Sequence, residues 1–260
     1  VPVPMYQDAP AAEFMFVLND AEIAYAIVDD QEQVDKMLEA RPQVPTLKHV
    51  YYDDPRGLRN YEGVTSFSRL QEIGREFDRA NPGWYEAEIA KGDADEVSVM
   101  LYTSGTTGKP KGVCQTHAAF IAAARGGCGF DRLTASDSIL SYLPMAWVGD
   151  HLFSFAQWLV AGFTINCPES GDTVMIDLRE IGPTYYFAPP RVFENLLTQV
   201  MIRMEDASAL KRWIFRRSMD VAKRVGSDVL DGRPVGTLDR VKYALGNLFA
   251  YGPLRNVLGM

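Results

Sequence analysis

The sequence predicts an α/β fold from the order of its apolar and polar segments. Residues 23–28 and 47–52 are short apolar runs typical of strands, and residues 30–41 between them have helical spacing with charged residues on the outside. A strand, a helix and a strand joined by short connections favour a parallel sheet covered by helices. Residues 97–188 repeat the alternation of strands and helices. We therefore expect the same fold class along the whole chain.

The other elements follow from the same spacing rules. We expect helices at residues 10–20 and 66–81, the second with Ser66 or Ser68 as its N-cap. The second half is predicted to contain strands at residues 97–102, 113–115, 138–143, 163–167 and 184–188, and helices at residues 117–125, 150–159, 174–181, 191–205, 209–225 and from about Leu238. The two strands around residues 103–112 are expected to form a hairpin with an oversized turn.

Composition excludes several classes of protein. Of the 260 residues, 47% are apolar and 23% are charged, which is typical of a globular protein and excludes a disordered or coiled-coil chain. The net charge of −8 argues against a nucleic-acid partner. The longest apolar stretch, residues 152–167, contains polar residues and is shorter than the about 20 residues that a membrane-spanning helix needs. We expect no transmembrane segment and no signal peptide.

The three cysteines show neither CxxC nor zinc-site spacing. We expect Cys114, Cys128 and Cys167 to be small core residues in a reducing environment. The expected location of the protein is therefore the cytoplasm, and a peripheral position on a membrane stays open. No cluster of metal ligands stands out.

The strongest local signal is the segment YTSGTTGKPKGV at residues 102–113. Its glycines permit backbone conformations closed to other residues, and its hydroxyls and two ammonium groups are what a polyphosphate requires. The alternative is a solvated hairpin turn, but such a turn does not require so many hydroxyls, glycines and lysines. The candidate phosphate-binding residues are Thr103, Ser104, Gly105, Thr106, Thr107, Gly108, Lys109 and Lys111.

This loop does not match two other well-known motifs. A Walker A loop needs GxxxxGK followed by Ser or Thr, but no glycine stands at the required spacing before Gly108 and Pro110 follows Lys109. A nucleophile elbow needs GxSxG, but Tyr102 stands at its first glycine position. A serine-dependent amidase is therefore a distant alternative, because Ser104 has no recognisable base partner.

With these motifs excluded, the segment resembles the phosphate-loop signature of the adenylate-forming (AMP-binding) superfamily. Two weaker motifs agree in order and spacing: SYLPMAWVGD at residues 141–150 resembles the segment that lines the acyl pocket, and YFAPPRVFENL at residues 186–197 resembles the family's strand–Pro-Arg–helix segment. Together with the helices around residues 203–224, these motifs look most like those of long-chain fatty-acid–CoA ligases. The resemblance covers essentially the whole chain and implies an acyl-CoA-synthetase-like N-terminal domain, with mixed and parallel sheets flanked by helices.

The resemblance implies a two-step ligase reaction. The carboxylate of an acid attacks the α-phosphate of ATP and releases pyrophosphate, and the thiol of CoA then displaces AMP from the acyl adenylate. The loop would hold the β- and γ-phosphates, and Mg²⁺ would share the task of neutralising charge. ATP, Mg²⁺ and CoA are thus the expected cofactor and co-substrates, with a fatty or other carboxylic acid as substrate. The oligomeric state stays open.

Trp147 stands where many relatives carry a histidine. An indole accepts no proton, so any role of that histidine is absent here. Trp147 is expected either to form a wall or gate of the acyl pocket or to be an ordinary core tryptophan.

Four other features also have a structural and a functional interpretation. His117 is expected to be a packed residue at a helix start, or else to shape the site, and His151 to be a surface or cap residue. Arg191 is expected to open a helix or to face the nucleotide. The glycines at 126, 127 and 129 do not complete GxGxxG, so packing or a helix end is expected for them.

Motifs that the family carries beyond this region do not occur before Met260. These are a Tyr-Gly-x-Thr-Glu motif, a ribose-binding Asp, a hinge and a small C-terminal domain with a catalytic Lys. The resemblance thus implies a central fragment of the large N-terminal domain, in which residues 1–95 and 96–260 form two parts of one AMP-binding domain and the C-terminal domain is absent. We expect an incomplete sheet and exposed apolar surface. An aromatic-acid–CoA ligase and a non-catalytic nucleotide- or acyl-binding module remain as alternatives.

Overall fold

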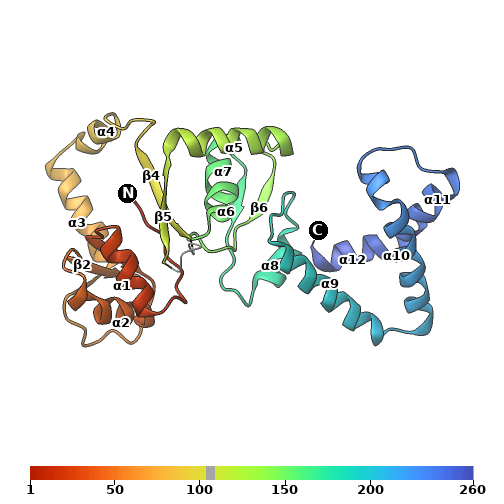
Figure 1. The fold of residues 1–260 in the computed structure, drawn as a ribbon, viewed down its shortest axis with the longest axis horizontal. Helices are drawn as coiled ribbons and strands as arrows, with labels where there is room; N and C mark the ends of the chain where they lie inside the picture. Colours follow the sequence, from red (N-terminus) through yellow and green to blue (C-terminus); the bar gives the residue numbers. More distant parts are fainter. Residues whose placement is uncertain (104–108, 260) are drawn as a thin grey trace. The chain divides into compact units, whose positions relative to one another are not determined.

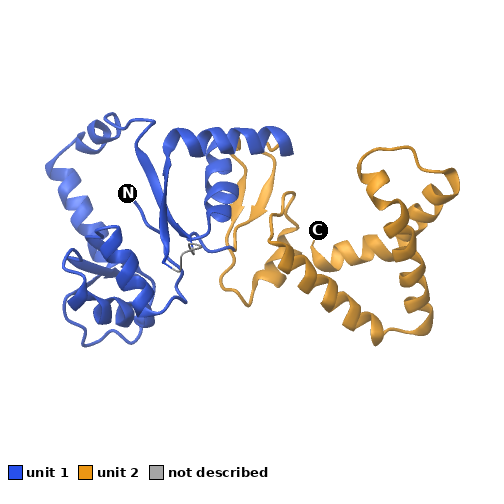
Figure 2. Cartoon of the chain, in the orientation of Figure 1, with its two compact units in different colours: residues 1–131, 143–160 blue, residues 132–142, 161–260 orange. Residues whose placement is uncertain are grey.

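The computed structural model describes residues 1–103 and 109–259. The chain divides into two compact units (Figure 2). Unit 1 contains residues 1–131 and 143–160, and unit 2 contains residues 132–142 and 161–259 of the described part.

Unit 1 begins with the parallel sheet that the sequence predicts. Strands β1 (Tyr25–Val28), β2 (His49–Tyr52) and β3 (Val64–Ser66) lie in the order β1-β2-β3, and both pairs are parallel. Helix α2 (Gln31–Ala40) connects the first two strands, followed by the single 3₁₀ turn η1 (Arg41–Gln43). The N-cap of α2 is Asp30, whose side chain accepts a hydrogen bond from the backbone N–H of Gln33 at 3.1 Å. The sequence did not predict β3, which has only three residues.

The core of this part of unit 1 lies between the helices and the sheet. Helix α1 (Ala11–Asp20) contributes Phe14 and Leu18, which are buried together with Met37 of α2 and Val50 of β2. Val50 thus belongs to one apolar cluster with residues of both helices. Burial of a side chain of this size contributes about 1.5–3 kcal/mol, so this cluster is the main source of stability here.

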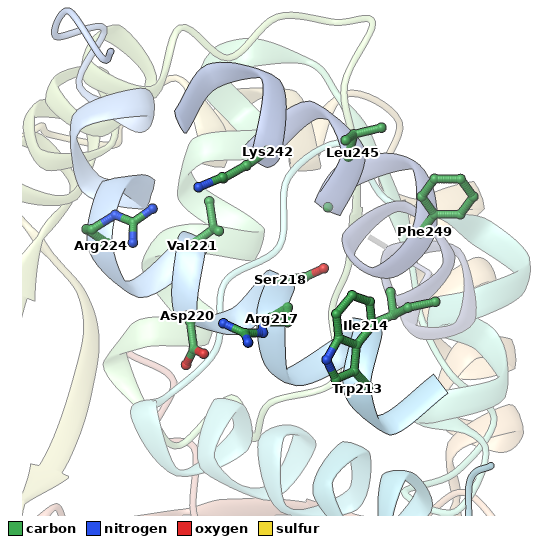
Figure 3. A pocket seen from close by; sticks show the side chains of 11 residues that line it. Trp213, Ile214, Arg217, Ser218, Asp220, Val221, Arg224, Lys242, Leu245 and Phe249 are labelled. Carbon is green, nitrogen blue, oxygen red and sulfur yellow. The ribbon is translucent and has the colours of Figure 1, made fainter. Parts of the chain in front are cut away.

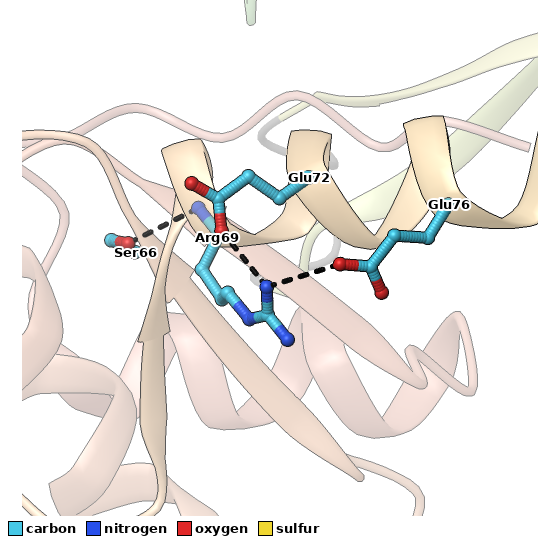
Figure 4. A network of polar contacts seen from close by, with 4 residues as sticks. All are labelled: Ser66, Arg69, Glu72 and Glu76. Atoms are coloured by element: carbon cyan, nitrogen blue, oxygen red, sulfur yellow. Dashed lines mark hydrogen bonds and ion pairs between the residues drawn. The ribbon is translucent and has the colours of Figure 1, made fainter.

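Helix α3 (Phe67–Ala80) begins at the N-cap that the sequence predicts. The Ser66 hydroxyl accepts a hydrogen bond from the backbone N–H of Arg69 at 3.2 Å. The Arg69 guanidinium also contacts Glu72 at 2.8 Å and Glu76 at 3.6 Å, so one arginine joins two later turns of the exposed face (Figure 4). A short helix that the sequence did not predict, α4 (Trp84–Ile89), follows.

Ser66→Ala is expected to destabilise the first turn of α3 by about 1 kcal/mol, because it leaves a backbone donor without its side-chain acceptor. Faster hydrogen exchange of the first amides of α3 would report this loss. Ser68→Ala is the matched control, because Ser68 lies inside the helix and is not its cap. Equal exchange rates in the two variants would contradict the role of Ser66.

The predicted hairpin is the second sheet of unit 1. Strand β4 (Val97–Thr103) pairs antiparallel with β5 (Lys111–Thr116), with Thr103 opposite Lys111 and Tyr102 opposite Gly112. The candidate phosphate loop is therefore the connection of this hairpin. Helix α5 (His117–Asp131) follows and is longer than predicted (Figure 1).

The predicted helix at residues 150–159 is divided into three pieces. These are the short α6 (Val148–Asp150), a π-helical segment η2 (His151–Ala156) and α7 (Gln157–Ala161). Gln157 is fully buried, and a Cβ on Gly127 of α5 would lie 2.2 Å from its Nε2. The packing role expected for the glycines of α5 is thus confirmed for Gly127, whereas the space beside Gly126 and Gly129 is open.

Unit 2 contains a two-stranded parallel sheet and a set of helices. Strands β6 (Ser138–Leu140) and β7 (Thr164–Asn166) pair with each other, and Tyr185 makes a single bridge to Ile139. The strand predicted at residues 184–188 is thus wrong: the segment reaches the sheet at only one residue. The helices of this unit are α8 (Val174–Ile181), α9 (Pro190–Glu205), α10 (Ala209–Leu230), α11 (Thr237–Gly246), the π-helical segment η3 (Asn247–Tyr251) and α12 (Gly252–Leu258).

Large apolar side chains are exposed in both units. Phe130 of α5 is 88% exposed and Leu230 of α10 is 84% exposed.

The prediction that all three cysteines are core residues is wrong, since Cys128 is buried but Cys114 and Cys167 are exposed. In the part of the chain that the structure describes, no helix has both the length and the apolar character needed to cross a membrane.

Candidate nucleotide and acid site

The candidate site is a cavity of about 910 Å³ in unit 1. It is lined by three groups of residues: the N-terminal segment with α1, both ends of the candidate phosphate loop, and the start of α6 with the residues before it. The lining residues are Pro4, Met5, Tyr6, Ala9, Pro10, Ala12, Glu13, Phe16, Val17, Leu101, Tyr102, Thr103, Lys109, Pro110, Ala146, Trp147 and Val148. A volume of this size is typical of sites for small organic ligands.

The loop end of the hairpin is fixed to α1 by a hydrogen bond. The Tyr102 hydroxyl donates to the Asp20 carboxylate at 2.6 Å, across 82 positions of the sequence. Burial and this hydrogen bond raise the pKa of Tyr102, which keeps its hydroxyl protonated as a donor. On the other strand, a Cβ on Gly112 would lie 2.9 Å from Met100 Sδ and 3.1 Å from Tyr102 Cζ. Gly112 therefore allows the Tyr102 ring to lie across the hairpin.

The structure places three of the predicted phosphate-binding residues at the loop end of the hairpin. Thr103 and Lys109 are exposed and line the cavity, and Lys111 is exposed at the start of β5 opposite Thr103. Two exposed ammonium groups at the C-terminal end of one short loop favour a negatively charged ligand. Ser104, Gly105, Thr106, Thr107 and Gly108 lie outside the described residues.

Trp147 lines the same cavity as Thr103 and Lys109 and is half-buried. Its position follows from the buried Gly149, because a Cβ there would lie 2.3 Å from Cζ3 of the indole ring. The structure thus brings the candidate loop and the candidate acid-pocket residue to one cavity. This arrangement is compatible with the interpretation of Trp147 as a wall of a ligand site.

In unit 2, two tyrosines join the two weaker motifs. Tyr142 and Tyr186 stack with ring centroids 5.7 Å apart, and the Tyr186 hydroxyl donates to the Tyr142 hydroxyl at 3.1 Å. The Tyr142 hydroxyl in turn donates to the carbonyl oxygen of Phe187 at 3.4 Å. Burial raises the pKa of both tyrosines. The pair holds the segment before α9 against the residues that follow β6.

The other candidate residues do not join the cavity. His117 is exposed at the first position of α5, and Arg191 is exposed in the first turn of α9. His151, for which a surface or cap position is predicted, is the C-cap residue of α6. It is half-buried, and its ring lies 5.6 Å from that of Phe120 and 5.8 Å from that of Phe155. Its Nδ1 is buried and has no hydrogen-bond partner among the residues that the structure describes.

Sequence reasoning missed the contribution of the N-terminal segment to the cavity. The backbone N–H of Met100 donates to the carbonyl oxygen of Pro2 at 3.0 Å, which places this extended segment beside β4. Tyr6 and Glu13 reach the cavity from this side. The two prolines near the N-terminus indicated an extended segment, but no local pattern indicated that it borders β4. Among residues 1–103 and 109–259, no group of three or more His, Cys, Asp or Glu side chains could hold a metal ion.

Known proteins resemble this chain over most of its length. The family model described as AMP-binding enzyme matches residues 1–246. Long-chain-fatty-acid–CoA ligase ACSBG2 of Xenopus laevis is 24% identical over 99% of this chain and 35% of its own length. Long-chain-fatty-acid–CoA ligase FadD15 of Mycobacterium bovis is 27% identical over 100% of this chain and 41% of its own length. The chain thus spans between a third and a half of the length of these relatives.

A solved structure shows the same fold. The anthranilate CoA ligase AuaEII, in complex with anthranoyl-AMP, superposes with a TM-score of 0.58 and 23% identity over 72% of this chain and 34% of its own. The fold is therefore that of the N-terminal domain of adenylate-forming enzymes, as predicted. Because the family model matches nearly the whole sequence, the chain belongs to the AMP-binding enzyme family.

Proposed function

We propose that this chain forms the phosphate-binding loop and part of the acid pocket of an ATP-dependent, AMP-forming fatty-acid–CoA ligase. A carboxylate oxygen of the acid attacks the α-phosphorus of ATP, and the bond to pyrophosphate breaks. The thiol sulfur of CoA then attacks the acyl carbon, and AMP leaves with the bonding electrons. Small molecules are the expected partners, and the cytoplasm, with or without peripheral contact to a membrane, is the proposed location.

The observation that carries this proposal is the shared cavity in unit 1. Thr103 and Lys109, at the two ends of the loop, and Trp147, from the predicted acid-pocket segment, line one space. A phosphate chain held by the loop would place the reacting α-phosphorus near an acid held beside the indole, which is what positioning catalysis requires. The names of the relatives support a long-chain fatty acid as the substrate.

Each group of candidate residues has a part in this proposal. Lys109 and Lys111 would neutralise the phosphates, with Ser104, Thr106 and Thr107 adding hydroxyl donors. Tyr102 would position the loop through its hydrogen bond to Asp20. Mg²⁺ would neutralise phosphate charge when bound. The described residues gather no carboxylate cluster for it, so no step is assigned to the metal. We further propose that residues 1–95 and 96–260 are two parts of one AMP-binding domain.

An aromatic acid is the second candidate substrate. The half-buried indole of Trp147 offers a flat apolar face to the cavity, which suits a planar ring as well as an alkyl chain. The similar structure of an anthranilate CoA ligase is compatible with this alternative.

Carboxylate-dependent ATP–pyrophosphate exchange on the native-length protein tests the proposal. Exchange with hexadecanoate is the expected result, and faster exchange with benzoate or anthranilate would select the aromatic alternative. A protein that binds ATP but exchanges with neither acid would instead be a non-catalytic nucleotide-binding module, and the proposal would be wrong.

A further inference from the structure

A second cavity, of about 530 Å³, lies in unit 2 between α10 and the segment formed by α11 and η3. Figure 3 shows Trp213, Arg217 and Arg224 along α10, with Lys242 and Phe249 on the opposite wall. None of these residues belongs to the three sequence motifs at residues 102–113, 141–150 and 186–197. This space is called the α10–α11 cleft below. Its other lining residues are Ile214, Ser218, Asp220, Val221, Leu245 and Gly246.

Polar contacts fix the two walls of the cleft to each other. The Arg224 guanidinium of α10 pairs with Asp239 of α11 at 2.5 Å. The hydroxyl of Tyr251, at the end of η3, donates to the backbone carbonyl oxygen of Ser218 in the middle of α10. Gly246 leaves room for the Tyr251 ring, since a Cβ there would lie 2.7 Å from ring atoms. The cleft is therefore a formed feature of unit 2 and does not depend on a ligand to hold its walls.

The apolar surface of the cleft is unusually open to solvent. Trp213 is 59% exposed, Leu245 is 51% exposed and Phe249 is 61% exposed. The three side chains come from both walls, so a ligand between them would be enclosed from two sides. Removing this surface from water is favourable by about 25 cal/mol for each Å² of apolar area.

The charged groups of the cleft are mostly cationic, although the protein carries a net charge of −8. Arg224 is neutralised by Asp239. No ion pair joins Arg217 or Lys242 to any other residue that the structure describes. Asp220 is the one acidic residue among those that line the cleft. Two unpaired cations thus stand beside an exposed aromatic and aliphatic surface.

We propose that the α10–α11 cleft binds a single amphipathic anion, with its aliphatic chain against Trp213, Leu245 and Phe249 and its charged end near Arg217 and Lys242. An anionic bilayer offers the same chemistry. The cleft is bounded by two helices that are fixed to each other, and its volume is that of a small-molecule site, which favours one molecule over a lipid surface. This site is independent of the proposed ligase function, because none of its residues lines the cavity of unit 1.

The test uses dodecanoate, below its micellar concentration, as the probe. Calorimetric titration of the chain with dodecanoate, butyrate and dodecyltrimethylammonium separates the contributions of chain and charge. Dodecanoate is expected to bind, and the two other ligands to bind about tenfold more weakly or not at all. Dodecanoate should also slow hydrogen exchange in α10 and α11, which distinguishes this cleft from the cavity beside Trp147.

Charge-removing variants complete the test. Arg217→Gln with Lys242→Gln is expected to weaken dodecanoate binding about tenfold and to remove the protection of α10 and α11. Arg216→Gln with Lys223→Gln is the matched control, because both residues are exposed on α10 but do not line the cleft. All four side chains are exposed, so both double variants should fold like the parent chain.

Three results would overturn the proposal. The first is equal binding of dodecanoate and dodecyltrimethylammonium, and the second is equal loss of affinity in the two double variants. The third is binding to phosphatidylglycerol vesicles, sensitive to Arg217 and Lys242, without binding of monomeric dodecanoate. A failure of ATP–pyrophosphate exchange would leave this proposal unchanged, because the exchange reaction reports only on the proposed ligase site.

Discussion

Replacing Lys109 and Thr106 by alanine in the native-length protein is expected to lower kcat/KM for ATP by about 100-fold or more. Each charge-assisted hydrogen bond to a phosphate contributes about 1.5–3 kcal/mol, and the double variant removes one ammonium group and one hydroxyl from the loop. Lys109 is exposed and lines the cavity of unit 1, whereas Thr106 lies outside the described residues. Steady-state kinetics at saturating acid and CoA measure the effect.

The control separates the loss of a phosphate contact from the loss of a surface charge. Lys91→Ala removes an exposed lysine of the same unit, which pairs with Glu88 and lies outside the cavity. It should leave kcat/KM for ATP within about twofold, because surface ion pairs contribute little. Thermal unfolding should be alike in all three proteins. If the double variant keeps the parent value of kcat/KM for ATP, the loop does not hold the phosphates.

The helices and strands of the first 60 residues could be predicted because their local signals agree. Asp30 supplies an N-cap, and apolar residues at helical spacing follow it in α2. Strands β1 and β2 have apolar runs bounded by polar turns, so their parallel pairing follows from the helix between them. Local propensity and tertiary packing favour the same structure here.

The errors fall where tertiary contacts outweigh local pattern. Residues 184–188 have the composition of a strand, but only Tyr185 reaches a partner strand, through a single bridge to Ile139. The helix predicted at residues 150–159 exists, but its middle is π-helical. No residue pattern at this position predicts the change from α-helical to π-helical hydrogen bonding. Cys114 lies on β5 with its side chain exposed, which composition alone does not indicate.

The candidate site could be predicted in part for a similar reason. The residues of the candidate phosphate loop form one continuous segment, so the sequence predicts phosphate binding there without knowledge of the fold. The cavity beside it also depends on Tyr6 and Glu13, which approach the loop only because the N-terminal segment lies along β4. The hydrogen bond between Tyr102 and Asp20 is equally long-range. Contacts of this kind have no signature in a single sequence.

Gly149→Ala is expected to destabilise unit 1 by about 1–3 kcal/mol and to change the KM for the acid more than the KM for ATP. The added methyl group would lie 2.3–2.6 Å from three atoms of the Trp147 ring, so the ring or the backbone must move. Gly149 is buried and Trp147 lines the cavity, so this displacement alters the proposed acid pocket. Denaturant unfolding and steady-state kinetics measure the two effects separately.

A second substitution shows whether the indole ring is the cause. Adding Trp147→Phe to Gly149→Ala removes the ring atoms nearest the new methyl group, so the double variant should recover part of the lost stability, which is the non-additivity expected of residues in contact. Gly126→Ala is the matched control, because Gly126 is a helical glycine with nothing within 4 Å of the added Cβ, and alanine there should be neutral or stabilising by up to about 1 kcal/mol.

The kinetic part of the same experiment tests the role of Trp147 directly. If the indole borders the acid, Gly149→Ala and Trp147→Phe both change the ratio of kcat/KM for hexadecanoate to that for benzoate, while the KM for ATP stays near its parent value. If Trp147 is only a packing residue, the two variants lose stability but keep that ratio. A change in the KM for ATP alone would instead place the indole against the nucleotide, since Trp147 shares its cavity with Lys109.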